Sequence, residues 1–183
     1  MTKAFKVECD KLVGHVLTNV YYEFGVEGFL NTRELNEVRF EYIPLSLLYF
    51  EMQSGSVFTF FDSTKFLEEF HFYTLDMRIE SNLDFQLKQW DQSKYFVWSK
   101  YLNKEIKSVE IIWGSLYKNH FRGNPPDIYP RGLEITFSED LSLVIVASEF
   151  DMVKDRYSFM CPDEALIVCF SREIYESLFG KEC

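Results

Sequence analysis

The sequence predicts an α+β protein, mainly antiparallel β with two or three short helices, built from a duplicated β-unit. Three observations support this prediction. Two stretches, near 12–61 and 101–147, resemble each other in the same order. Short β-prone runs are separated by turn residues, as in strands that are joined by hairpins. Helix-capping residues flank only short segments, so helices form the smaller part of the fold.

The internal repeat consists of two aligned blocks. Residues 12–25 align with 101–114 without a gap, and 44–60 align with 130–146. Matched apolar positions are Leu17 with Ile106, Val20 with Val109, Tyr22 with Ile111, Phe24 with Trp113, Leu47 with Leu133 and Phe58 with Val144. The alternative is chance similarity between generic strands. Duplication predicts one compact domain over 1–183, made of two similar halves, 1–85 and 95–183.

Each copy begins with a predicted strand. Its apolar positions alternate with a period of two after a one-residue offset, which predicts a half-buried strand with a bulge near its start. The positions are Leu17, Val20, Tyr22 and Phe24 in one copy, and Ile106, Val109, Ile111 and Trp113 in the other. A hairpin follows in each copy, because turn residues at 53–56 and 138–140 separate β-prone runs.

The first hairpin is followed by a predicted short helix over 62–70, which Asp62 or Ser63 can cap. The join around 82–100 contains no flexible linker and many apolar residues, so the halves are expected to share a core. The clearest loop is 119–132, where three prolines and two glycines argue against regular structure.

Two further helices are predicted from their ends. Ser171 can cap a terminal helix over 172–179, and Gly180 can end it. A weaker candidate begins at Asn31, which stands at capping-box spacing from Glu34.

Composition indicates a folded, soluble protein of the cytoplasm. The 183 residues are 47% hydrophobic and 18% aromatic, far from the composition of disordered chains. No run approaches the ~18 apolar residues of a membrane helix, and the first ten residues lack the apolar region of a secretory signal. A net charge of −10 and a pI near 4.8 repel phosphate backbones and anionic lipids. Nucleic-acid and membrane binding are therefore not expected.

No catalytic or metal-binding motif is recognisable, so we expect no enzyme activity, no metal and no cofactor. The cysteines have no zinc-ligand spacing and are expected to be reduced thiols, with Cys169 in the core. Each histidine has a structural explanation, although His120 lies beside Arg122 in the loop. The residues concerned are Cys9, Cys161, Cys169 and Cys183, and His15, His71 and His120.

Partner binding is the function that the loop favours, because it combines aromatic residues with arginine as protein interfaces do. The predicted partner-binding residues are Phe121, Arg122, Ile128 and Tyr129 in the loop, with Glu68 and Glu69 on an acidic face. The alternative for the loop is that its aromatic side chains cover the core.

The leading hypothesis is a non-enzymatic, acidic protein-binding protein that engages a basic partner. An immunity or antitoxin-type inhibitor of a basic toxin or enzyme has this character. The alternative is a small-ligand-binding module with its pocket between the duplicated halves. An enzyme with a dispersed site around His120 or His71 is a third hypothesis. Homo-oligomerisation through a strand edge is compatible with the sequence.

Overall fold

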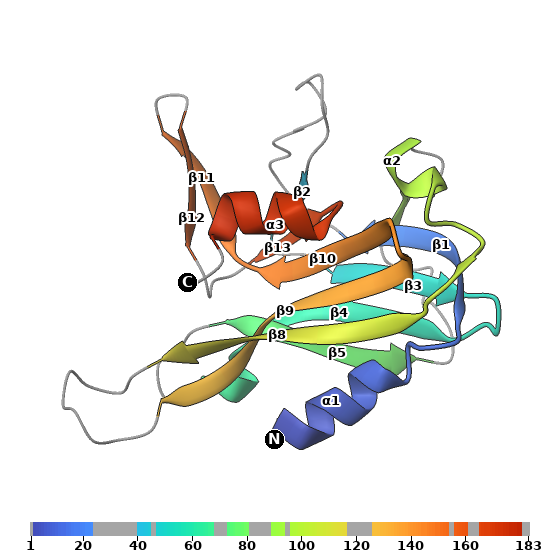
Figure 1. Cartoon of the computed structure of the whole chain (residues 1–183), viewed down its shortest axis with the longest axis horizontal. Helices are drawn as coiled ribbons and strands as arrows, with labels where there is room; N and C mark the ends of the chain where they lie inside the picture. The colour runs from blue at the N-terminus through green and yellow to red at the C-terminus, as the bar shows by residue number, and fades with distance from the viewer. Residues whose placement is uncertain are drawn as a thin grey trace.

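The computed structural model shows a sandwich of two antiparallel sheets with helices around it (Figure 1). The described residues are 2–23, 40–44, 47–67, 73–80, 89–93, 96–116, 126–153, 156–160 and 165–180. The predicted class, α+β with mainly antiparallel strands, is confirmed. The candidate helix at Asn31 lies outside the described residues.

The six-stranded sheet has the order β5-β4-β3-β1-β6, and β7 also pairs with β1. Its strands are β1 (Val16–Glu23), β3 (Leu47–Met52), β4 (Val57–Ser63), β5 (Thr74–Glu80), β6 (Gln89–Asp91) and β7 (Lys104–Glu105). The predicted bulge near the start of β1 is confirmed, since its register with β3 shifts between Leu17 and Asn19. In the β3–β4 turn, Gly55 takes a φ of +84°, which glycine adopts without strain.

The five-stranded sheet has the order β2-β13-β10-β9-β8. Its strands are β2 (Phe40–Pro44), β8 (Ser108–Leu116), β9 (Asp127–Ser138), β10 (Leu141–Ala147) and β13 (Ala165–Cys169). A separate two-stranded hairpin consists of β11 (Glu149–Val153) and β12 (Arg156–Met160). The predicted second hairpin is confirmed as β9 and β10.

The core lies between the two sheets, where alternate residues of facing strands form one hydrophobic cluster. Fully buried members include Leu17, Phe50, Phe58, Phe60, Leu133, Ile135, Leu143, Ile145, Leu166 and Val168. The short helix α2 (Phe96–Ser99) and the turn after it add Trp98 and Tyr101 to this cluster. Trp98 packs edge-on against Phe50 of one sheet and Phe170 after the last strand of the other. The join between the predicted halves therefore fills the centre of the core.

Helix α1 (Thr2–Asp10) contacts β5, β8 and β9 and buries Phe5 and Cys9. This helix was not predicted from the sequence, although Phe5, Cys9 and Leu12 follow the spacing of a helical apolar face.

The terminal helix α3 (Arg172–Phe179) is confirmed together with both predicted caps. The Ser171 hydroxyl accepts from the Ile174 N–H, and Gly180 has a φ of +74°. The predicted helix over 62–70 is shorter than expected within the described residues. It is the 3-10 helix η2 (Thr64–Phe66), which Ser63 caps through the Lys65 N–H.

Two local predictions for the second copy are wrong. Residues 127–132 of the predicted loop belong to β9, because the register shift beside Pro130 accommodates a residue that lacks an N–H. The offset after Ile106 is a break between β7 and β8, not a bulge within one strand.

The two predicted copies contribute similar meanders, β1-β3-β4 and β8-β9-β10, to different sheets. Their registers differ by one residue. Tyr22 pairs with Leu48, whereas its counterpart Ile111 pairs with Leu133, the counterpart of Leu47. Strand order alone does not establish duplication. The halves also exchange strands, since β2 pairs with β13 and β7 pairs with β1.

Across the described part of the chain, none of the helices has both the length and the apolar character needed to cross a membrane.

Candidate functional site

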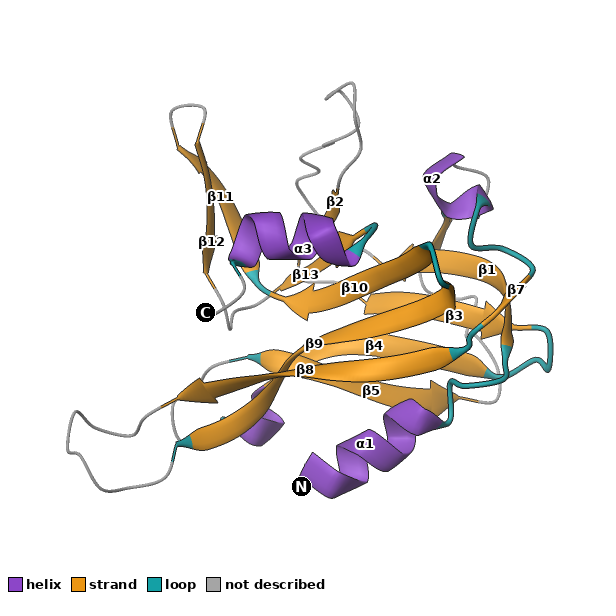
Figure 2. Ribbon diagram, viewed as in Figure 1, coloured by secondary structure: helices purple, strands orange, loops and turns teal. Residues whose placement is uncertain are grey.

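The predicted partner-binding residues that the structure describes lie near the start of β9. Ile128 and Tyr129 belong to this strand, whereas Phe121, Arg122, Glu68 and Glu69 lie outside the described residues. Strands β8 and β9 run beyond the rest of the sandwich as a two-stranded ribbon (Figure 2). The distal end of this ribbon is therefore the candidate site.

One face of the ribbon presents two large apolar side chains. Trp113 is 40% exposed and Ile128 is 44% exposed. Trp113 pairs with Pro130, and Ile128 pairs with Ser115, so the two apolar residues are diagonal neighbours on the same face. We call Trp113 and Ile128 the ribbon patch. Tryptophan is among the residues that contribute most to protein–protein binding when a partner covers it.

The exposure of Trp113 corrects the sequence analysis. Trp113 continues the apolar alternation of Val109 and Ile111, which lie partly buried against the core cluster. The period-two alternation correctly predicted that Trp113 lies on the same face of β8 as Val109 and Ile111. It carried no information about how far tertiary packing covers each position, and Trp113 stays 40% exposed although Val109 and Ile111 are partly buried.

The opposite face of the ribbon holds the buried Tyr129, whose ring lies over Gly114 of the neighbouring strand. A Cβ added to Gly114 would lie 2.4 Å from Cζ of Tyr129, closer than real contacts allow. An aromatic ring over a strand glycine covers backbone that would otherwise be bare. The Tyr129 ring and Gly114 thus pack together on one face of the ribbon, while Ile128 is exposed on the other face.

Gly114→Ala is expected to lower the free energy of unfolding by about 1–3 kcal/mol, because the new methyl group displaces the Tyr129 ring. Urea denaturation followed by circular dichroism measures the loss. Ser115→Ala, an exposed neighbour, is the control and should change stability by less than about 0.5 kcal/mol. In a Tyr129→Ala background the Gly114→Ala cost should disappear. An unchanged cost there would show that the ring contact is not its cause.

The base of the ribbon is anchored by a buried arginine. Arg131 sits at the register shift between β8 and β9, and its guanidinium lies 5.6 Å from each ring centroid of Tyr175 and Phe179 on α3. The guanidinium also donates to the Phe179 carbonyl at 3.4 Å. Cation–π contacts of this kind strengthen when they are shielded from water. Arg131 therefore ties the ribbon to α3.

Two carboxylates lie opposite each other on the outer surface of β8 and β9. Glu110 of β8 pairs directly with Glu134 of β9, an arrangement of like charges that destabilises a sheet. Arg172 of α3 binds Glu134 at 2.9 Å and Glu176 at 3.1 Å. Glu110 is exposed, and among the described side chains none forms an ion pair with it. This edge of the sheet is locally acidic.

A second group of carboxylates lies on the outer face of the six-stranded sheet. Glu51 accepts hydrogen bonds from Asn19 at 2.7 Å and from the Tyr21 hydroxyl at 3.1 Å, and Glu23 accepts from Tyr49. Burial and the nearby Glu51 raise the pKa of Tyr21 to about 12. Burial and the hydrogen bond to Glu23 raise the pKa of Tyr49 as well. These tyrosines stay neutral donors at physiological pH.

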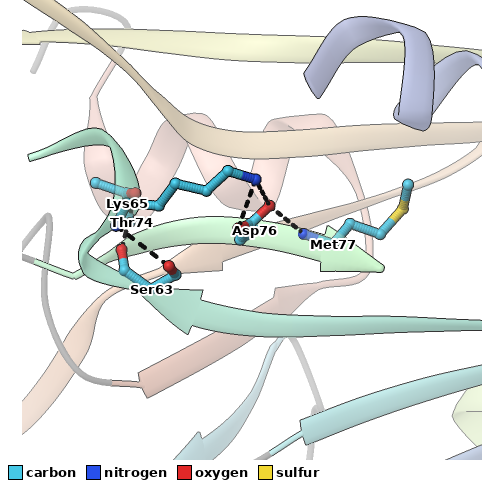
Figure 3. A network of polar contacts seen from close by, with 5 residues as sticks. All are labelled: Ser63, Lys65, Thr74, Asp76 and Met77. Carbon is cyan, nitrogen blue, oxygen red and sulfur yellow. Dashed lines mark hydrogen bonds and ion pairs between the residues drawn. The ribbon is translucent and has the colours of Figure 1, made fainter. Parts of the chain in front are cut away.

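The edge of the six-stranded sheet at β5 is closed by a polar network (Figure 3). The buried Asp76 accepts from its neighbour Met77 N–H at 2.8 Å and pairs with Lys65 at 3.0 Å. Thr74 donates to the Ser63 carbonyl at 3.1 Å. Occupying an edge N–H in this way blocks the addition of another strand.

The groups that enzymes and metal sites use are not gathered among the described residues. His15 Nδ1 lies 3.2 Å from the exposed Ser54 hydroxyl at a hairpin turn, and its ring packs on Phe58. Burial raises the pKa of the Cys9 thiol to about 12 and raises that of Cys169 too, so neither is a nucleophile at neutral pH. Within the described ranges, no three His, Cys, Asp or Glu side chains are placed to hold a metal ion. His71, His120, Cys161 and Cys183 lie outside these ranges.

Comparison with known proteins does not assign the chain to a family. No protein-family model matches it, and no curated protein or solved structure is significantly similar to it. The function must therefore be argued from the ribbon and its surroundings.

Proposed function

We propose that this chain is a non-enzymatic protein-binding protein that engages a basic partner through the ribbon patch. The observation that carries the proposal is the exposure of Trp113 beside Ile128 on the two-stranded ribbon. Both side chains leave a large apolar area in water, which a partner would bury with a gain of about 25 cal/mol per Å². Behind the ribbon patch, the buried Tyr129 ring packs on Gly114, so the opposite face of the ribbon is already covered.

The charge of the chain supports a basic partner. Its net charge is −10, and Glu110 lies exposed on the same strand as Trp113. An acidic surface attracts a cationic protein and accelerates its association, most strongly at low ionic strength. An immunity or antitoxin-type inhibitor of a basic toxin or enzyme, acting in the cytoplasm, fits this combination. The remaining predicted contacts, Phe121, Arg122, Glu68 and Glu69, lie outside the described residues.

The two meanders are proposed to descend from one duplicated β-unit. Their matching strand order supports this proposal. Duplication then requires that the strand register of one copy shifted by one residue after the copies diverged. A ligand pocket between the halves remains the alternative function. Along the described strands, the space between the sheets is filled by fully buried side chains of the core, among them Trp98 and Tyr101. This filling favours protein binding over a pocket there.

The test is affinity capture of the tagged chain from a lysate of its own cells at low salt, with elution by rising salt and mass spectrometry. We expect one basic protein to be retained stoichiometrically and released by salt. Trp113→Ala should abolish most of the retention, because interface tryptophans commonly contribute at least about 2 kcal/mol. The control is Phe96→Ala, which removes an aromatic ring that is 91% exposed on α2, and it should retain the partner.

Two results would contradict the proposal. One is an empty eluate at low salt from the folded wild-type chain. The other is retention that Trp113→Ala leaves unchanged, since binding would then use another surface.

A further inference from the structure

The edge of the five-stranded sheet at β8 differs from the β5 edge of the six-stranded sheet. Asp76 occupies an edge N–H of β5. The side of β1 that faces away from β3 is also occupied, because it pairs with β6 and β7 and its Val20 N–H donates to the Ser93 hydroxyl at 2.9 Å. Strand β8 comes last in its sheet and, in the part of the chain that the structure describes, pairs with β9 alone. In an antiparallel edge strand, alternate residues direct their N–H and C=O groups away from the sheet.

The edge of β8 is covered just before the strand begins and continues into the ribbon at its other end. Helix α1 packs between β5 and β8, and the turn after it bonds to Ile106, just before β8 begins. Towards Leu116 the strand continues into the ribbon, beyond the other strands (Figure 2). Backbone groups along β8 can therefore receive an additional strand.

We propose that the partner binds by adding an extended segment to the edge of β8, with a basic residue beside Glu110 and an apolar residue beside Trp113. This inference rests on the proposed function and specifies how the partner is bound. Backbone pairing supplies the hydrogen bonds, and the two side-chain contacts select the sequence.

The side-chain pattern follows from β8 itself. Glu110 faces Glu134 across the ladder, and Arg172 is already shared between Glu134 and Glu176. Arg172 therefore attracts Glu110 only from beyond ion-pair distance, and a lysine or arginine on an added strand would give Glu110 a close ion pair. Trp113 is three residues further on, so it points to the opposite face. The segment that fits carries basic residues on one face and apolar residues on the other.

A second copy of this chain is a poorer occupant of the same edge. Each copy carries a net charge of −10, so two copies repel each other, whereas a basic segment is attracted. Charge therefore favours a strand from a basic partner over a strand from a second copy of this chain.

The experiment uses the full chain and a capped synthetic peptide of alternating Lys and Val, as long as β8. Such a peptide places every lysine on one face and every valine on the other. Calorimetry at low salt compares it with the same peptide N-methylated at alternate valines. N-methylation keeps the charge but removes edge hydrogen bonds, so we expect binding to weaken about tenfold or more. An alternating Glu and Val peptide should not bind.

Protein variants locate the peptide. Trp113→Ala should weaken binding about tenfold, and Glu110→Gln about two- to fivefold, in line with exposed ion pairs. Glu139→Gln makes the same charge change at the exposed β9–β10 turn and should leave the affinity unchanged. Circular dichroism confirms that each variant is folded.

Three outcomes would overturn the inference: no binding of the Lys/Val peptide, equal binding of its N-methylated form, or equal effects of Glu110→Gln and Glu139→Gln. Concentration-dependent dimerisation that Trp113→Ala abolishes would instead make a second copy the occupant. These failures are distinct from failure of the proposed function. If lysate capture depends on Trp113 but N-methylation has no effect, protein binding stands and strand addition does not.

Discussion

Trp98→Ala lowers the free energy of unfolding by about 3–5 kcal/mol, the range for removing a large buried aromatic side chain. Trp98 is fully buried, and its ring lies between Phe50 and Phe170, at 5.7 and 5.2 Å between ring centroids. Its indole Nε1 donates to the Tyr22 hydroxyl at 2.8 Å. The substitution leaves a cavity at the point where both sheets and the join between them meet.

Urea denaturation monitored by far-ultraviolet circular dichroism measures this loss. The matched control is Phe96→Ala, on the same short helix but exposed, and it should change stability by no more than about 0.5 kcal/mol. Equal costs for the two variants would contradict the central place of Trp98 in the core.

Alkaline unfolding is the second large effect. Burial raises the pKa of the Cys9 thiol from 9.0 to about 12, and burial together with Glu51 raises that of Tyr21 from 10.0 to about 12. Burial also raises the pKa of Tyr101. These groups are neutral when protonated, and the unfolded chain loses their protons first. Stability is therefore fully present below pH 9 and declines as pH rises towards 12.

The decline is measured by urea denaturation at intervals from pH 7 to pH 12. Each deeply buried group that stays protonated while the unfolded chain ionises contributes about 1.4 kcal/mol per pH unit, and the partly exposed Tyr21 contributes less. Tyr101→Phe should start at lower stability but lose less of it between pH 10 and pH 12. A stability profile that stays flat to pH 11 would contradict the assigned burial.

Local sequence signals predicted the parts of the fold that depend on local chemistry. Ser171 and Gly180 mark the two ends of α3. Both ends were predictable because capping and a positive φ are properties of single residues. The hairpin turn at Gly55 follows the same logic. The alternation in β1 also placed Val20 and Tyr22 in the core.

Features that depend on distant residues were not predictable in this way. The turn chemistry of 119–132 suggested a loop, but pairing with β8 extends β9 back to Asp127. The exposure of Trp113 depends on which distant residues pack against it. Among the predicted binding residues, Ile128 lies exposed in the ribbon patch, and Tyr129 lies behind it on Gly114. Propensity describes a residue and its neighbours, whereas these outcomes were set by tertiary contacts.

The exchange of β2 between the halves has a consequence for biosynthesis. Phe40 pairs with Cys169, and Pro44 pairs with Ala165, so β2 leaves the ribosome well before the strand that it pairs with. At a synthesis rate of about 5–20 residues per second, β2 waits roughly 6–25 s for β13 to be translated. During that interval the newly made amino-terminal region must keep an unpaired β-strand away from other nascent chains. Chaperones that shield unpaired strands are therefore expected to act on the chain during this interval.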